Sequence, residues 1–325
     1  MKPRLRTAFF TAAAIACAAA PLSGATSSGR AVLRLLDSRA AGDATRYTEA
    51  AAVVAAEAAR GGAVQQFVIA AVSRFDDAPA SVRIDAATRE RYIAASRPLV
   101  EAAAKKGSAM AWYLIAVADN DRDALERAIA LGNVQAMNVA GTEKIESDPR
   151  EAFALFSAAA ETGDANALYN RGFCLEKGIG TERDAAAAFE CFRRAADEGH
   201  PGALNNLGAM YREGRGTERD PAKAMECFRR AAIAGGAQAR INLAMMLVSG
   251  EAGWRDARKG LILLESVAAK GDAVAAETLS RCYADGAGGL EPDSRLSAWW
   301  LVFARALKGD ANASRWLEAN PKEGK

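Results

Sequence analysis

The 325-residue sequence has a single histidine, His200, and lacks the residue clusters that usually carry chemistry. It contains no Gly-x-Ser-x-Gly, His-Glu-x-x-His or Gly-x-x-x-x-Gly-Lys-Ser/Thr motif, so the signatures of serine hydrolases, zinc proteases and P-loop enzymes are absent. His200 directly follows a glycine, and no second histidine accompanies it, which favours a turn residue over a catalytic base. We therefore predict a non-enzymatic protein without catalytic residues, cofactor or metal.

An excess of charge of one sign is also missing. Lysine and arginine total 42 against 40 aspartate and glutamate, and the first 25 residues hold three of the basic residues and no acid. Without them the balance is 39 against 40. A protein that binds nucleic acid or an anionic membrane through electrostatics normally has a clear basic excess. We therefore expect no nucleic-acid partner.

Residues 1–25 read as a targeting segment. A basic start is followed by an apolar run from Ala8 to Ala20, and small residues precede a cleavage point after Ala25. This pattern predicts a signal peptide, export to the periplasm or outside the cell, and a mature chain without a transmembrane span. The alternatives are an uncleaved first helix, or lipidation at Cys17 after a sequence that departs from the usual lipoprotein box.

A 36-residue repeat organises the middle of the chain. Residues 178–198 read GIGTERDAAAAFECFRRAADE, and residues 214–234 read GRGTERDPAKAMECFRRAAIA. A fixed period of this length is typical of a solenoid built from stacked units, each too small to bury its apolar face alone.

Each repeat is predicted to be one antiparallel helical hairpin. Asp184 and Asp220 stand where a helix N-cap belongs, and Pro221 follows at the first helical turn. Gly199 and Gly235 close the second helices, where a left-handed residue lets the chain turn back. No strand-like alternation appears, so the fold class is all-α.

These residues resemble the Sel-one-like repeat family, which is related to tetratricopeptide repeats. The resemblance implies a right-handed α-solenoid of antiparallel helical hairpins with a concave groove. It covers about half of the chain well, and the third copy departs most, with Ala244 in place of a glycine. The best-matching copy carries the family pattern at Ala203, Asn206, Leu207, Gly208, Tyr211, Gly214, Gly216, Asp220, Lys223, Ala224, Phe228, Ala231, Ala232 and Gly235.

The sequence predicts five segments. They are a signal peptide (1–25), an N-terminal helical region (26–105), degenerate helical repeats (106–163), four Sel-one-like repeats (164–309), and a C-terminal capping helix with a tail (310–325). A final helix from Ala311 to Ala319, with Trp316 and Leu317, is expected to cap the array, because the apolar face of the last repeat has no neighbour to cover it.

The cysteines that remain after cleavage are not spaced as metal ligands. Cys191 and Cys227 occupy the same position in adjacent repeats, where stacked helices lie about 8–10 Å apart, beyond the roughly 7 Å limit for a disulfide. Cys174 and Cys191, across one hairpin, are the local pair that could form one. Small buried thiols are the favoured interpretation for these residues and for Cys282.

Functional information is expected where the copies differ. Positions spaced i, i+4 and i+7 on each first helix share one side of that helix, and the resemblance places this side in the groove. Periodicity alone does not separate a groove from an interface between hairpins. The candidate partner-binding residues are Tyr169, Phe173 and Glu176; Asn205 and Arg212, with Ala209 between them; Ile241, Met245 and Val248; and Glu277 and Arg281, followed by Ala284.

Asn170, Asn206 and Asn242 recur with the repeat, and this regularity favours hydrogen bonds inside the scaffold over a ladder that grips a peptide backbone.

We therefore expect an interaction scaffold of the cell envelope that holds a protein or peptide in its groove. The alternative, which comes from cysteine-rich relatives, is an exported enzyme acting on peptidoglycan or β-lactams, although Ser-x-x-Lys and Lys-Thr-Gly are absent. A third possibility is a structural module whose partner binds residues 26–105.

Overall fold

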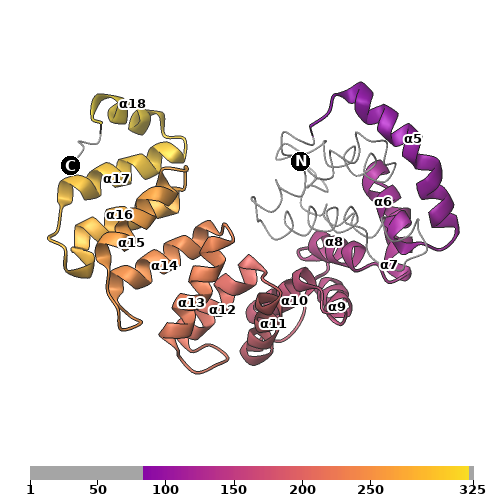
Figure 1. Ribbon diagram of the computed structural model, residues 1–325, viewed down its shortest axis with the longest axis horizontal. Helices are drawn as coiled ribbons and strands as arrows, with labels where there is room; N and C mark the ends of the chain where they lie inside the picture. Colours follow the sequence, from indigo (N-terminus) through magenta and orange to yellow (C-terminus); the bar gives the residue numbers. More distant parts are fainter. Residues whose placement is uncertain (1–82, 322–325) are drawn as a thin grey trace. The chain divides into compact units, whose positions relative to one another are not determined.

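The computed structural model describes residues 83–321, which contain α-helices, one short 3-10 helix and no strand (Figure 1). The chain divides into two compact units, one ending at Ala203 and the other beginning at Leu204. The helices of the first unit are α5 (Ala86–Lys105), α6 (Ala109–Asp119), α7 (Arg122–Ala130), α8 (Val134–Lys144), α9 (Pro149–Ala160), α10 (Ala165–Lys177) and α11 (Ala185–Asp197).

The second unit continues the same alternation of first and second helices. In Figure 1, helices α14 to α18 follow one another side by side, each packed against the one before it. Its elements are α12 (Pro201–Glu213), which begins before the boundary, α13 (Pro221–Ile233), α14 (Ala237–Ser249), α15 (Ala257–Ala268), α16 (Ala273–Asp285), the 3-10 helix η2 (Ala287–Gly289), α17 (Ser294–Leu307) and α18 (Ala311–Ala319).

The N-caps predicted at Asp184 and Asp220 are present, and the other second helices from α9 onward have the same cap. The capping aspartates are Asp148, Asp184, Asp220, Asp256 and Asp293, and each accepts the backbone N–H three residues ahead at 2.9–3.0 Å. Such a cap stabilises a helix by about 1 kcal/mol. Because the caps recur, they fix the point at which each hairpin turns into its second helix.

The loops between paired helices close in the same way in successive hairpins. Gly214 takes a left-handed conformation, with φ of 72°, and its N–H bonds to the carbonyl of Met210 at 2.8 Å. The N–H of Asp220 then bonds back to the carbonyl of Tyr211 at 2.8 Å. These bonds make the segment from Gly214 to Gly216 part of a hairpin turn.

A small residue on the first helix lets each pair of helices approach closely. A Cβ atom on Gly208 would lie 2.8 Å from the Phe228 ring, which is fully buried. In the third hairpin the first helix carries Ala244 instead. There Gly260 on the second helix provides the space, since a Cβ on it would lie 2.6 Å from the Ala244 carbonyl oxygen. The departure of the third copy is therefore compensated across the helix pair.

The C-terminal end has the predicted closing helix. The structure places α18 at Ala311–Ala319, as the sequence predicts. Trp299 of α17 stacks on Phe303 with centroids 5.3 Å apart and donates its Nε1–H to the Asn320 carbonyl at 3.0 Å. Aromatic packing and one backbone hydrogen bond thus attach the end of the chain to the last hairpin.

The predictions for residues 1–82, including the signal peptide and lipidation at Cys17, lie outside the described residues, as does residue 322 onward. The part of the 26–105 region that is described, from residue 83, contains α5. Between residues 83 and 321, none of the helices combines the length and apolar character required to span a bilayer.

Candidate functional site

The first candidate trio lies on α10 and is largely occupied by packing within the first unit. The Tyr169 ring stacks on the imidazole of His200, with ring centroids 4.6 Å apart. It also lies at a tilted angle to the Phe192 ring, with centroids 5.9 Å apart. Phe173 is half-buried, and Glu176 is buried with 7% of its surface exposed. These side chains contribute to the unit itself and present only part of their surface to solvent.

In the second unit, the candidate residues of α12 and α14 meet through an asparagine contact. Asn242 Nδ2 donates to Asn205 Oδ1 at 2.9 Å, and both side chains are half-buried. In the first unit, Asn170 Nδ2 similarly donates to Asn138 Oδ1 at 3.5 Å. The interpretation of these asparagines as scaffold hydrogen bonds is confirmed for Asn170 and Asn242. Asn206 instead accepts from its neighbour Asn205 at 3.5 Å.

The third trio, on α14, is mostly core. Ile241 and Val248 are 4% and 1% exposed and belong to the apolar cluster of the second unit, so neither is accessible to a partner in this conformation. Met245 is half-buried, with its Sδ atom 3.9 Å from the Cys282 sulfur. Only Met245 therefore extends the trio toward the surface.

The fourth trio, on α16, is more open. Arg281 and Ala284 are exposed, and an Arg281 guanidinium nitrogen donates to Thr278 Oγ1 at 3.4 Å. Glu277 is half-buried and forms an ion pair with Lys308, the C-cap residue of α17. We call the accessible side chains of α12, α14 and α16 the first-helix face, and it consists of Asn205, Ala209, Arg212, Met245, Glu277, Arg281 and Ala284.

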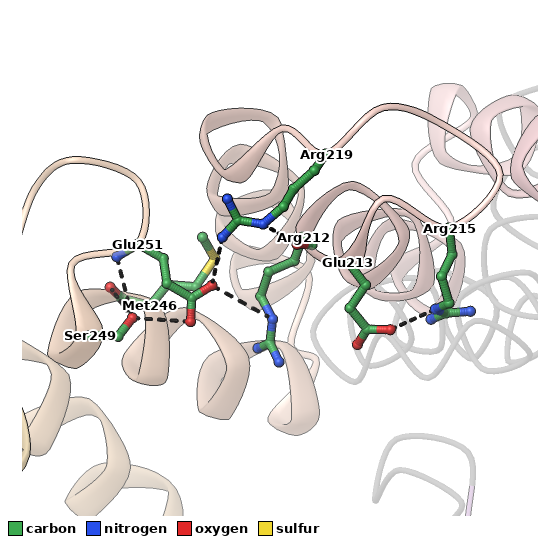
Figure 2. A network of polar contacts seen from close by, with 7 residues as sticks. All are labelled: Arg212, Glu213, Arg215, Arg219, Met246, Ser249 and Glu251. Atoms are coloured by element: carbon green, nitrogen blue, oxygen red, sulfur yellow. Dashed lines mark hydrogen bonds and ion pairs between the residues drawn. The ribbon is translucent and has the colours of Figure 1, made fainter.

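A cationic cluster forms where α12 and α14 end, and Figure 2 shows its two principal arginines directed toward one carboxylate. Arg212 Nε and an Arg219 terminal nitrogen each lie 3.9 Å from Glu251 Oε2. The other carboxylate oxygen accepts the Ser249 hydroxyl at 3.3 Å. Distances of 3.9 Å exceed the 2.7–2.9 Å typical of charge-assisted hydrogen bonds, so Glu251 holds both guanidinium groups only loosely.

The hairpin turn brings these arginines together. Arg219 directly precedes the N-cap Asp220, and its Nε donates to the carbonyl oxygen of Arg212 at 3.1 Å. From the next loop, Arg255 donates to the Ser249 carbonyl at 3.4 Å. Arg212, Arg219, Arg255 and Glu251 form the arginine cluster, whose formal charge is +2.

The sequence predicted Arg212 as a site residue but not its neighbours. Arg219 lies in the repeated segment TERD, which looks like scaffold because its counterpart Arg183 recurs one repeat earlier. The distinguishing signal is the residue seven positions before each arginine, which is Glu176 in the first copy and Arg212 in the second. Because the arginine recurs in both copies, the sequence pattern indicates a scaffold residue. Its role in the cluster depends on the residue seven positions earlier, which differs between the copies.

His200 has a structural role that accounts for its ring. Its Nδ1 accepts the N–H of Ala203 at 3.0 Å, as an N-cap does, and the side chain is 7% exposed. Burial lowers the pKa of His200 to about 4 because a charged imidazole would lose its hydration. The ring is therefore neutral near pH 7. The sequence predicted a turn residue at this position, and in the structure its side chain also accepts a capping hydrogen bond.

The four described cysteines are free and buried. Burial raises the pKa of the Cys174 and Cys227 thiols to about 11, and it also raises the pKa values of Cys191 and Cys282. The open choice between a Cys174–Cys191 disulfide and buried thiols is thus resolved in favour of thiols. Within residues 83–321, no group of histidine, cysteine and acidic side chains is arranged to hold a metal ion.

Comparison with protein families finds the Sel1 repeat five times in this chain. The matches run without a gap from residue 126 to residue 307, more than half of the 325 residues. The first match falls almost entirely within residues 106–163, where degenerate repeats were expected. The matched segments are 126–164, 165–200, 201–236, 237–272 and 273–307. A search of curated proteins finds no significant match.

Solved structures share this architecture. A Sel1 repeat protein from Oxalobacter formigenes is 26% identical, with a TM-score of 0.53, over 65% of this chain and 90% of that one. A protective antigen of uropathogenic Escherichia coli with an SLR fold has a TM-score of 0.56 at 21% identity, over 87% of this chain and 63% of that one. The chain is an all-α solenoid of helical hairpins and belongs to the Sel1 repeat family, whose members are generally protein-interaction scaffolds.

Proposed function

We propose that this protein is a non-enzymatic scaffold of the cell envelope that binds a protein or peptide partner on the first-helix face of its second unit. The proposal rests on one observation, which is that the repeated residues and the variable residues of each hairpin have different roles. Residues that repeat, such as Asp220, Gly208 and Phe228, are used for caps and packing. Residues that vary, such as Arg212, Met245 and Arg281, reach the surface of that face.

The chemistry of the face suits a peptide. Met245 provides a flexible apolar contact, and Arg281 provides an exposed charge. Methionine adapts its shape to different apolar side chains, and alternating polar and apolar contacts match the side chains of a bound segment. The face thus offers both affinity and selectivity without a catalytic group.

The envelope location rests on the N-terminal sequence. A signal peptide ending at Ala25 would give a mature protein that begins at Thr26. Cell fractionation followed by mass spectrometry of the purified protein tests this. A mature chain starting at Thr26 in the exported fraction supports the proposal, and an intact N-terminus in the cytoplasm contradicts it.

Partner binding is tested by capture from envelope extract with the full chain as bait. The face variant carries Met245→Ala and Arg281→Ala. Its control carries Arg193→Ala and Arg229→Ala, which remove two exposed arginines from the second helices α11 and α13. Arg193 pairs with Glu190 and Asp197, and Arg229 pairs with Glu226. Both arginines lie on second helices, so the substitutions change no residue of the first-helix face.

We expect the face variant to lose partners that the parent and the control both capture, with all three proteins equally helical by circular dichroism. Equal partner sets for the face variant and the parent would contradict the proposal that partners bind the first-helix face.

A further inference from the structure

We propose that the arginine cluster of Arg212, Arg219 and Arg255 binds a carboxylate-rich protein segment, and that Glu251 occupies the position of one ligand carboxylate until the segment arrives. The inference rests on the proposed function and deepens it, because Arg212 belongs to the first-helix face. It specifies the partner as an acidic peptide.

The ion pairs within the cluster are incomplete. Glu251 Oε2 lies 3.9 Å from a nitrogen of each of two guanidinium groups, while its Oε1 accepts the Ser249 hydroxyl. One carboxylate therefore faces two arginines and hydrogen-bonds neither through Oε2. Each guanidinium has five N–H donors arranged to grip a carboxylate in two-point fashion. An incoming carboxylate at normal bonding distance gains contacts that Glu251 does not make.

The arginines are held in place before the ligand binds. Arg219 donates its Nε–H to the backbone of Arg212, so its remaining donors are directed away from that bond and toward Glu251 (Figure 2). The side chains of Arg212 and Arg219 are 33% and 57% exposed, and that of Glu251 is 35% exposed. A ligand can therefore reach the cluster, and little side-chain freedom is lost on binding.

Two neighbouring acids, Glu213 and Asp220, have partners outside the cluster. Glu213 pairs with Arg215 at 2.6 Å, and Asp220 serves as an N-cap and pairs with Lys223 at 3.3 Å. These carboxylates are already engaged, whereas the cluster keeps its charge of +2. Charge complementarity with an acidic segment follows.

A protein segment fits the cluster better than a nucleic acid or a lipid surface. The chain beyond residue 25 has 39 basic and 40 acidic residues, so it lacks the overall basic excess that is typical of proteins binding a polyphosphate backbone. Trp254, in the same loop as Glu251 and Arg255, is 55% exposed. Lys259 Nζ lies 5.6 Å from the centre of this ring, and the exposed part of the ring offers a contact for an apolar side chain next to the acids of a peptide.

The chain contains a matched control in Arg183. It precedes the N-cap Asp184 as Arg219 precedes Asp220, but Glu176 takes the position of Arg212. Removing Arg183 deletes an arginine from the same kind of loop without touching the cluster. Equal effects of Arg183→Ala and Arg219→Ala would indicate nonspecific electrostatics.

The test measures binding of fluorescein-labelled hexaglutamate to the full chain by fluorescence anisotropy, at low and at physiological ionic strength. Hexaglutamine, oligothymidylate and vesicles containing anionic phospholipid are compared with it. The proteins are the parent and the single variants Arg212→Ala, Arg219→Ala, Arg183→Ala and Glu251→Gln. Circular dichroism confirms that each is folded.

We expect hexaglutamate to bind, and Arg212→Ala and Arg219→Ala each to weaken binding about tenfold, the equivalent of one charge-assisted contact. Arg183→Ala should change affinity by less than about twofold, as for a remote exposed charge. Glu251→Gln should strengthen binding about threefold because it removes the competing carboxylate. This gain is decisive, because a variant that merely unfolds cannot bind more tightly.

The inference is overturned if hexaglutamate does not bind, if Glu251→Gln leaves its affinity unchanged, or if Arg183→Ala weakens it as much as Arg219→Ala. Tighter binding of oligothymidylate or of anionic vesicles than of hexaglutamate also overturns it. The proposed function has a separate readout, since its capture experiment alters Met245 and Arg281 and leaves the arginine cluster intact. Loss of captured partners there, without hexaglutamate binding here, would retain the scaffold and reject the acidic partner.

Discussion

His200 makes the folded protein sensitive to acid in a way that can be isolated, because the chain has no other histidine. Burial lowers its pKa from 6.5 to about 4. The unfolded chain therefore binds more protons than the folded chain between these two values. The stabilisation that the neutral ring provides is complete above pH 6.5 and is lost as the pH falls toward 4.

The magnitude follows from the size of the shift. Each pKa unit corresponds to 1.36 kcal/mol, so a shift of this size makes the free energy of unfolding about 3 kcal/mol smaller near pH 4 than at pH 7. Protonation of Nδ1 also removes the acceptor for the Ala203 N–H, which is the local event that weakens the start of α12.

The assay combines urea unfolding at a series of pH values with an NMR titration of the single imidazole. The control is His200→Asn, because asparagine caps a helix without titrating. It loses the ring stacked on Tyr169 and is expected to be about 1 kcal/mol less stable at pH 7. Its stability should then fall by about 3 kcal/mol less than that of the parent between pH 7 and pH 4.

Two results would refute this reasoning. One is a measured pKa near 6.5 for His200 in the folded protein. The other is a set of parallel stability curves for the parent and His200→Asn across the whole pH range, since the carboxylates common to both proteins would then explain the entire acid effect.

Two further predictions concern packing. Gly208→Ala gains about 1 kcal/mol of helix propensity, but its Cβ would overlap the Phe228 ring, which costs about 1–3 kcal/mol, so we expect a net loss in urea unfolding. Adding Phe228→Leu, which copies the Ala–Leu pair of the third hairpin, should recover part of the loss, and a double variant no better than Gly208→Ala would contradict the proposed overlap. The thiols of Cys174 and Cys227, with pKa values raised to about 11 by burial, should react with Ellman's reagent at pH 8 only after urea unfolds the protein. Rapid reaction of the folded chain would show that these sulfurs are accessible.

The fold could be predicted from sequence because each hairpin repeats the residues that start and end its helices. Asp184 and Asp220 mark helix starts through short-range hydrogen bonds, and Gly199 and Gly235 mark helix ends through a backbone conformation that other residues rarely adopt. Such local signals do not depend on what lies across the interface. These signals can therefore be recognised from the sequence alone.

The candidate site was less predictable because burial depends on neighbours. Ile241, Met245 and Val248 share a helix side in the sequence pattern, yet only Met245 reaches the surface, since Ile241 and Val248 belong to an apolar cluster with residues of α15, α16 and α17. Arg219 and Glu251 approach each other from different loops, and no sequence spacing specifies a contact of that kind. The chemical type of each candidate residue could be taken from the sequence, whereas the exposure of its side chain to solvent could not.

The exchange of a small residue between Ala244 and Gly260 has a consequence for the history of the repeat. Duplicated hairpins begin with the same space between their helices, and a mutation that fills it from one side is tolerated only beside a vacancy on the other. Selection therefore acts on the helix pair rather than on one position. In a scan of all single substitutions, added side-chain volume should be poorly tolerated at position 208 of the second hairpin and at position 260 of the third, where a Cβ would lie 2.8 Å from the Phe228 ring and 2.6 Å from the Ala244 carbonyl oxygen.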